Sequence, residues 1–186
     1  MLRLAILISG GGRTLVNLHE RIIGGTLPAR IDVVVSSQSH AKGVERARAL
    51  GLPTVILDHK CHEEALFHDA VTDAVRGVDL VCMAGFVHFW RIPDSLLGRV
   101  INIHPALLPE FGGMGMYGMH VHRAVIAAGR TESGCTVHFC DNEYDHGPII
   151  LQRRVPVLRH DQPEDLAGRV FEAECVAYPA AIRRLS

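Results

Sequence analysis

The 186-residue sequence lacks both a strong excess of charge and a long apolar run. Its formal net charge is −1 at pH 7, and no basic tract indicates binding to nucleic acid or to an anionic membrane. The N-terminal apolar run Leu4–Ile8 stops at glycines. It is too short for the core of a signal peptide, and no other run is long enough for a membrane span. We therefore expect a soluble, cytoplasmic protein that acts on small molecules.

Cysteine pairs are missing as well. The five cysteines form no C-x-x-C motif and are odd in number: Cys61, Cys82, Cys135, Cys140 and Cys175. Since Cys82 lies inside an apolar run, this pattern is typical of a reduced, cytosolic protein. The chain length predicts one domain, residues 1–186, with a single core. Both a monomer and a homodimer remain open.

Short apolar runs alternate with segments of helical spacing in the first part of the chain. They predict strands at Leu2–Ile8, Arg30–Ser36, Thr54–Leu57, Asp79–Met83 and Val100–Ile103, and helices at Leu15–Ile23, Lys42–Leu50 and Glu63–Val75. Continuous apolar strands between helices are typical of a parallel sheet with helices on both faces. The predicted fold class is therefore α/β, with a doubly wound and mostly parallel sheet.

The last part of the chain departs from this alternation. A helix is expected first, followed by two β-rich runs, at Val121–Ala128, Gly134–Phe139 and Pro148–Val157 respectively. The two runs predict an antiparallel extension of the sheet. A final helix is expected to begin after Asp161 and to end near Arg184, because Asp161 and Glu164 have the spacing of a capping box.

Two polar side chains stand at the end of the fifth predicted strand. Asn102 and His104 are two residues apart, so that on a strand they point to the same side. Pro105 and Pro109 then prevent regular continuation, which makes this a strand that runs into a loop. In an open parallel α/β sheet, ligands bind at such an exit. A packed core histidine and an asparagine that caps the loop are the alternative interpretation.

A second polar turn, Asp145-His146-Gly147, separates the two β-rich runs and could converge on the same crevice. An aspartate beside a histidine orients the imidazole and favours its charged form, and an asparagine amide can donate to a developing oxyanion. These groups suit acyl transfer. No serine or cysteine has a supporting motif such as G-x-S-x-G, so the residues favour direct transfer between two bound substrates.

A glycine turn follows the first strand, at Ser9–Thr14. It does not match a dinucleotide fingerprint, because Leu15 occupies the position that needs a small residue and no acid follows the second strand. It does not match a P-loop either. A run of backbone N–H groups at a helix N-terminus suits a single phosphate, and a tight turn without a ligand is the alternative.

Three further features leave alternatives open. His120 and His122, with His104, His138 and Asp145 as possible further ligands, invite a metal interpretation, but no zinc spacing supports it and we predict no metal. Glu174 shares a predicted helical face with Val170 and Ala177, so its carboxylate either reaches solvent or accepts hydrogen bonds from ligand hydroxyls. The glycine-rich loop from Pro105 to Gly118 is long for a compact domain, and such loops are usually functional or poorly ordered.

The segments Asn102–Pro109 and Asp145–Gln152 together resemble the phosphoribosylglycinamide formyltransferases of purine biosynthesis. The resemblance extends over nearly the whole chain and includes Leu7–Gly10, Ala84–Phe86, Gly134–Phe139, Glu174 and Tyr178-Pro179. The wider folate-dependent formyltransferases share the Asn-x-His-Pro and Asp-x-Gly motifs. These two motifs therefore specify the chemistry better than they specify the acceptor.

The resemblance implies that 10-formyltetrahydrofolate, as cosubstrate, donates a formyl group to the amine of glycinamide ribonucleotide, with no metal. It identifies the catalytic residues as Asn102, His104 and Asp145. The acceptor would contact Gly11, Gly12, Arg13, Thr14, Pro105 and Glu174. The folate would contact Phe86, Val87, His88, Phe89, Trp90, Cys140, Asp141, Asn142 and Glu143.

The sequence departs from the family pattern in a few places. His88 stands where many members have a basic residue, Arg13 and Thr14 replace a small polar pair, and Phe111–Met119 is longer than in well-known members. A methionyl-tRNA formyltransferase or a formyltetrahydrofolate hydrolase should carry a further domain, so the length disfavours both. A metallohydrolase and a noncatalytic nucleotide-binding module are the remaining alternatives.

Overall fold

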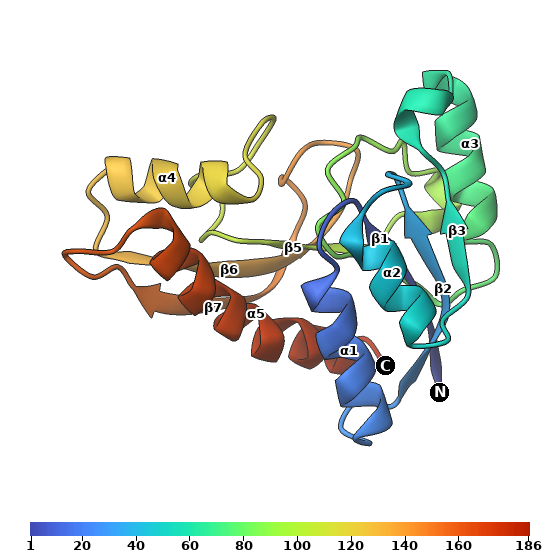
Figure 1. Ribbon diagram of the computed structural model, residues 1–186, viewed down its shortest axis with the longest axis horizontal. Coiled ribbons are helices and arrows are strands. Elements are labelled where there is room, and N and C mark those ends of the chain that lie inside the picture. Colours follow the sequence, from blue (N-terminus) through green and yellow to red (C-terminus); the bar gives the residue numbers. More distant parts are fainter. The chain divides into compact units, whose positions relative to one another are not determined.

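The computed structural model describes residues 1–186. Its strands form a seven-stranded sheet in the order β3-β2-β1-β4-β5-β6-β7, and all of these strands except β4 are labelled in Figure 1. The chain divides into two compact units, Met1–Ile101 with Ser186, and Asn102–Leu185, and each is described by itself below. That residues 1–186 form one domain stays a prediction. None of the helices combines the length and the apolar composition that a membrane span requires.

The first unit is wound outward from its first strand. Strand β1 (Leu2–Ile8) pairs in parallel with β2 (Ala29–Ser36) and with β4 (Leu80–Met83), and β3 (Thr54–Ile56) pairs in parallel with β2. The chain therefore proceeds first to one side of β1 and later to the other. This is the predicted doubly wound order, and its switch point lies at the carboxyl ends of β1 and β4, where ligands bind in such folds.

Burial explains why these strands read as continuous apolar runs. Every residue from Leu4 to Ile8 is fully buried, as expected for a strand covered on both faces. Helix α1 (Arg13–Ile23) packs on α2 (Lys42–Ala49) and on β2, and α3 (Glu64–Ala74) also contacts β2. Two short 3-10 helices, His59–Cys61 and Asp94–Leu96, complete the unit. The sequence pattern did not predict these two turns.

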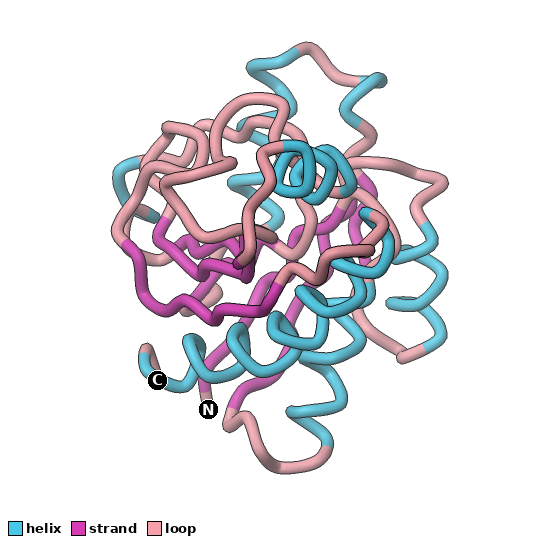
Figure 2. Tube along the Cα trace, turned by 90° about the vertical axis from the view of Figure 1, so that its left-hand side faces the viewer, coloured by secondary structure: helices cyan, strands magenta, loops and turns pink.

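The second unit is built on an antiparallel strand pair. It begins within β5 (Val100–His104), and β6 (Glu132–Phe139) pairs with β7 (Ile149–Pro156) in antiparallel register. Helix α5 (Pro163–Arg184) packs on β6, on β7 and on α4 (Met119–Ala127). Figure 2 shows α5 as the long helix that leads to the C-terminus. The predicted antiparallel extension is confirmed.

The capping box of α5 lies one residue later than predicted. The side chain of Gln162 accepts from the N–H of Asp165, while the Asp165 carboxylate accepts from the N–H of Gln162. The prediction of Asp161 and Glu164 was wrong, because the Asp161 carboxylate is bound by the guanidinium of Arg169, at 2.7 and 3.0 Å. The Asp161 carboxylate also accepts from the N–H of Leu158 at 2.8 Å, so its contacts are directed to Arg169 and Leu158.

Candidate active site

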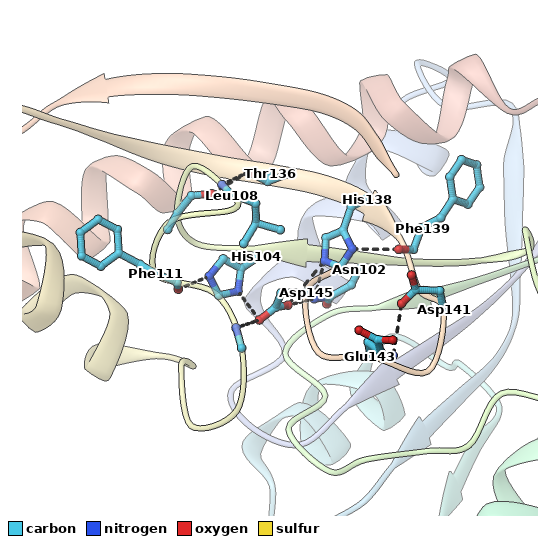
Figure 3. A network of polar contacts seen from close by, with 12 residues as sticks. Asn102, His104, Leu108, Phe111, Thr136, His138, Phe139, Asp141, Glu143 and Asp145 are labelled. Carbon is cyan, nitrogen blue, oxygen red and sulfur yellow. Dashed lines mark hydrogen bonds and ion pairs between the residues drawn. The ribbon is translucent and has the colours of Figure 1, made fainter. Parts of the chain in front are cut away.

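The three predicted catalytic side chains meet in the second unit. Asn102 and His104 come from the end of β5, and Asp145 comes from the connection between β6 and β7 (Figure 3). Asp145 Oδ1 accepts from Asn102 Nδ2 at 3.4 Å, and Asp145 Oδ2 lies 3.4 Å from His104 Nδ1. The side chains of His104 and Asp145 are only 3% and 10% exposed. The two segments therefore converge as the sequence suggested, while their catalytic roles stay predictions.

Local backbone geometry explains why the Asp-x-Gly sequence suits this connection. Asp145 has a left-handed φ of 54°, a conformation that aspartate tolerates better than most residues. Gly147 lies directly against β6, where a Cβ atom would be only 2.0 Å from the carbonyl oxygen of Phe139. Only glycine can therefore occupy position 147 without moving the strand end that directs Asp145 toward β5.

A backbone carbonyl fixes which ring nitrogen of His104 carries hydrogen. His104 Nε2 lies 2.8 Å from the carbonyl oxygen of Phe111. Because a carbonyl only accepts, Nε2 must be the donor. In the neutral ring, Nδ1 then carries a lone pair and faces Asp145 Oδ2. A proton added to His104 would therefore lie at Nδ1, between the ring and the carboxylate.

Burial and charge act in opposite directions on this pair. Burial lowers the pKa of His104, and the charge of Asp145 and the Phe111 carbonyl, which raise it, do not compensate. Burial raises the pKa of Asp145, but hydrogen bonding with His138, the charge of His104 and the Gly113 N–H together hold it below its ordinary value. Asp145 does favour the charged imidazole, as expected. Since burial is the larger effect, the pKa of His104 lies below its ordinary value.

The sequence interpretation missed three groups around Asp145. His138, which is 1% exposed, lies with Nε2 3.3 Å from Asn102 Nδ2 and 3.5 Å from Asp145 Oδ1. Its Nδ1 contacts the carbonyl oxygen of its neighbour Phe139 at 2.9 Å. The other two groups are backbone atoms, the Phe111 carbonyl and the Gly113 N–H, which donates to Asp145 Oδ2 at 3.0 Å.

The available signal for His138 was its position between the apolar residues Val137 and Phe139 of a predicted strand, but His138 was considered only as a metal ligand. Nowhere in the chain are three or more His, Cys, Asp or Glu side chains arranged to hold a metal ion. His120 and His122 lie in the first turn of α4, the former exposed and the latter buried. Backbone groups such as those of Phe111 and Gly113 leave no signal in the residue types.

The glycine turn lies in the first unit, at the N-terminus of α1. Gly12 is the N-cap, with a left-handed φ of 70°, and no side chain caps the helix. A Cβ on Gly12 would lie 2.7 Å from the Cα of Gly43 in α2. Gly12 therefore provides the close helix approach that the dinucleotide pattern assigns to a later position, occupied here by the buried Leu15. Gly11 and Arg13 are exposed, and Thr14 is half-buried.

Hydrogen bonds join the segment Phe86–Trp90 to the glycine turn and to the residue after β2, all within the first unit. Val87 N–H donates to Ser9 Oγ at 3.0 Å, and His88 Nδ1 lies 2.9 Å from Ser37 Oγ. The ring of His88 stacks on His59 with centroids 4.2 Å apart. Burial lowers the pKa of His88, and the charge of His59 lowers it further.

The predicted folate residues differ in exposure. Val87 is 36% exposed and Trp90 only 2%, and Trp90 Nε1 donates to Thr72 Oγ1, so Trp90 belongs to the core of its unit. Phe86, His88 and Phe89 are half-buried. In the second unit Cys140, Asp141 and Asn142 are half-buried and Glu143 is exposed. The Asp141 carboxylate accepts from the Glu143 N–H and contacts His146 Nδ1 at 2.7 Å.

Glu174 lies where the helical pattern placed it. It is half-buried on α5, between the buried residues Val170 and Ala177. Burial raises the pKa of the Cys135 thiol to about 12, and the nearby Glu174 charge raises it as well. Pro105 is half-buried directly after His104. Whether the glycine turn and Phe86–Trp90 face the Asn102–His104 pair concerns two different units and stays a prediction.

Comparison with known proteins identifies the family. The profile of the formyl transferase family matches residues 2–182. The chloroplastic phosphoribosylglycinamide formyltransferase of Vigna unguiculata is 42% identical over 98% of this chain and 60% of its own length. The phosphoribosylglycinamide formyltransferase of Haemophilus influenzae is 34% identical over 98% of this chain and 86% of its own length. The chain thus spans about three fifths of the plant relative but most of the bacterial one.

A solved structure gives the same result for the fold. Glycinamide ribonucleotide transformylase 1 from Symbiobacterium toebii superposes with a TM-score of 0.90 at 40% identity, covering 98% of this chain and 86% of that one. The structure of the phosphoribosylglycinamide formyltransferase from Brucella melitensis gives a TM-score of 0.89 at 36% identity, over 99% and 95% of the two chains. The chain belongs to the formyl transferase family.

Proposed function

We propose that this protein transfers a formyl group from 10-formyltetrahydrofolate to the amine of glycinamide ribonucleotide, a step of purine biosynthesis. The observation that carries the proposal is the cluster of Asn102, His104 and Asp145, which combines an amide donor with a buried histidine and carboxylate. Relatives that are similar over nearly the whole chain bear the name of this activity. Proteins of this class act on small molecules, and we place the protein in the cytoplasm.

The reaction that suits this cluster is direct attack of the amine on the formyl carbon. The amine nitrogen forms a bond to that carbon, and the bond between the carbon and N10 of the folate then breaks. One proton of the amine ends on N10. In the tetrahedral intermediate the former carbonyl oxygen carries negative charge, which the Asn102 amide and protonated His104 stabilise. Asp145 stabilises the imidazolium and moves the proton by way of water.

The substrates would be held by groups whose chemistry matches theirs. The phosphate of the acceptor suits the uncapped N-terminus of α1, with backbone N–H groups at Gly11, Gly12, Arg13 and Thr14. The ribose hydroxyls suit the half-buried carboxylate of Glu174, and Pro105 lines the same substrate. The folate is assigned to residues 86–90 and 140–143. Because His88 has a lowered pKa, it offers the folate a neutral ring at pH 7.

The decisive experiment is to incubate the protein with 10-formyltetrahydrofolate and glycinamide ribonucleotide and to follow both products. We expect tetrahydrofolate and formylated ribonucleotide to appear in equal amounts. Tetrahydrofolate without formylated ribonucleotide would instead identify a hydrolase or a different acceptor. His104→Ala should remain folded and lose about 10²-fold to 10⁴-fold in kcat, since it removes the protonated ring that stabilises the developing oxyanion.

A further inference from the structure

Two side chains of the antiparallel strand pair hold the segment that follows His104. Thr136 on β6 and Gln152 on β7 are direct partners in the ladder. Thr136 Oγ1 donates to the carbonyl oxygen of Ala106 at 2.7 Å and accepts from the N–H of Leu108 at 3.0 Å. Gln152 Nε2 donates to Thr136 Oγ1 and to the Leu108 carbonyl oxygen, both at 2.9 Å. We call Thr136 and Gln152 the strand clamp.

The Thr136 hydroxyl and the Gln152 amide N–H groups of the strand clamp are all engaged in hydrogen bonds. A hydroxyl offers one donor and two acceptor lone pairs, and Thr136 uses all three in the bonds above. The two N–H groups of Gln152 are both used as well. Thr136 is fully buried, whereas Gln152 is an exposed residue that reaches inward with its amide. A network in which the Thr136 hydroxyl and both Gln152 N–H groups are engaged specifies one position for residues 106–108.

Leu108 transmits this position to the candidate active site. A Cβ on Gly112 would lie 2.6 Å from Leu108 Cδ2 and 3.1 Å from Asp145 Cβ, so the Gly112 backbone fits tightly between these two side chains. The residues on either side of Gly112 supply the Phe111 carbonyl that binds His104 and the Gly113 N–H that binds Asp145. Figure 3 shows Thr136 and Leu108 on one side of His104 and Phe111 on another. A shift of Leu108 would therefore reach both catalytic side chains.

We propose that Gln152 and Thr136 are positioning residues, which act through residues 106–113 to keep the Phe111 carbonyl on His104 Nε2 and the Gly113 N–H on Asp145. In this arrangement His104 stays in the Nε2–H tautomer, and a proton that it gains lies at Nδ1, facing Asp145. The effect of the strand clamp on turnover rests on the proposed formyl transfer. Its effect on the His104 tautomer does not.

The test uses four variants of the full chain. Gln152→Leu removes both amide donors from an exposed residue, and Thr136→Val removes the hydroxyl while keeping the branched shape. Thr136→Ser restores the hydroxyl. Ser133→Ala is the matched control, because Ser133 is a buried residue of the same strand whose hydroxyl has no hydrogen-bond partner. Thermal unfolding reports whether each variant folds.

Two measurements are made on each variant. The ring ¹⁵N chemical shifts of His104 across a pH titration report its tautomer and its protonation, with Asp145 and His138 as the titratable groups that face it. Steady-state kinetics with 10-formyltetrahydrofolate and glycinamide ribonucleotide separate kcat from KM. We expect wild type, Thr136→Ser and Ser133→Ala to show the Nε2–H tautomer. Gln152→Leu and Thr136→Val should show a tautomer mixture, a shifted His104 titration and a kcat lowered by about 10-fold to 100-fold, because small misplacements of catalytic groups have effects of this size.

The proposal is overturned if folded Gln152→Leu and Thr136→Val keep the wild-type tautomer and titration of His104. If Thr136→Val does not fold, Gln152→Leu decides, since its side chain lies at the surface. A wild-type protein that transfers no formyl group would refute the proposed function. The tautomer measurement would then still decide the role of the strand clamp.

Discussion

Replacement of Asp145 by asparagine tests the candidate active site most directly, because the two side chains have the same shape. An asparagine oxygen can keep the 3.0 Å hydrogen bond from the Gly113 N–H, and its NH₂ group can donate to His138 Nε2, which lies 3.5 Å from the present Oδ1. The fold should therefore be retained. Two features disappear: the negative charge 3.4 Å from His104 Nδ1, which stabilises an imidazolium at that position, and the 3.4 Å hydrogen bond that Asp145 Oδ1 accepts from Asn102 Nδ2.

We expect Asp145→Asn to lower kcat for formyl transfer by about 10²-fold to 10⁴-fold, the usual range for a lost acid-base or electrostatic contribution. At about 1.36 kcal/mol for each factor of ten, this corresponds to a barrier increase of about 3–5 kcal/mol. The pKa of His104 should fall further, because Asp145 is the strongest influence that raises it. A loss of imidazolium and a loss of rate should therefore occur together.

The effect on stability should be small and should depend on pH in a defined direction. The native pKa of Asp145 is lowered from 3.8, so its charge stabilises the fold above this pH, and the stabilisation is lost as the pH falls through the native pKa. Exchange of a charged for a neutral acceptor costs about 1 kcal/mol. Wild type and variant should thus differ at pH 7 and become equally stable in acid.

The assays measure urea unfolding, kcat and the ring ¹⁵N shifts of His104. The control for a general change in charge is Asp73→Asn, which replaces an exposed carboxylate of α3. A folded Asp145→Asn variant with a kcat within tenfold of wild type would refute the assignment of Asp145. So would a rise in the pKa of His104.

Three further predictions concern the glycine turn, the buried His104 and the half-buried His88. Gly12→Ala should lower the free energy of unfolding by about 2–5 kcal/mol in urea titrations. Left-handed backbone strain of about 1–2 kcal/mol adds to overpacking against Gly43 of about 1–3 kcal/mol. The control is Gly10→Ala, which has nothing within 4 Å of its Cβ and should change the free energy of unfolding by less than about 0.5 kcal/mol. Arg13→Ala should raise KM for the ribonucleotide more than KM for the folate, and an equal rise in both would contradict the phosphate assignment. The native pKa values of His104 and His88 are lowered from 6.5, so on acidification these histidines are protonated first in the unfolded chain. The free energy of unfolding should therefore fall as the pH drops below about 6.5. His88→Gln should make this dependence of stability on pH less steep in calorimetry, and an unchanged dependence would contradict the role of His88.

The elements that could be predicted are those whose residues carry a periodic pattern. Leu2–Ile8 was predicted as a strand and is β1, because a strand buried on both faces needs apolar residues throughout. The start of α1 was missed by two residues. Gly12, in a left-handed conformation, allows the helix to begin at Arg13, whereas the apolar pattern begins only at Leu15. Helix starts that depend on backbone conformation are poorly marked by hydrophobic spacing.

The candidate active site likewise contains groups that the sequence pattern marks and groups that it does not. Asn102 and His104 could be paired from strand alternation, and Asp145 could be added from its place in a second polar turn. The protonation of His104 could not be derived in this way, because it depends on how deeply the ring is buried and on a carbonyl seven residues later. Any residue at position 111 supplies a carbonyl, and any residue but proline at position 113 supplies an N–H. Their contribution therefore becomes visible only in three dimensions.

The sequence predicts that Phe111–Met119 is longer than in well-known family members, and the contacts of this segment indicate where extra length could lie. Phe111 and Gly113 contact His104 and Asp145, and the chain then turns at once, with Met116 N–H bonded to the Gly113 carbonyl. The exposed residue Met114 lies within that turn and the exposed residue Tyr117 directly after it. Extra length placed there leaves the two backbone contacts intact, because the strand clamp fixes the loop on the side of Leu108. The loop can thus vary in length beyond Gly113 while the strand clamp on β6 and β7 maintains the tautomer of His104 and the position of Asp145.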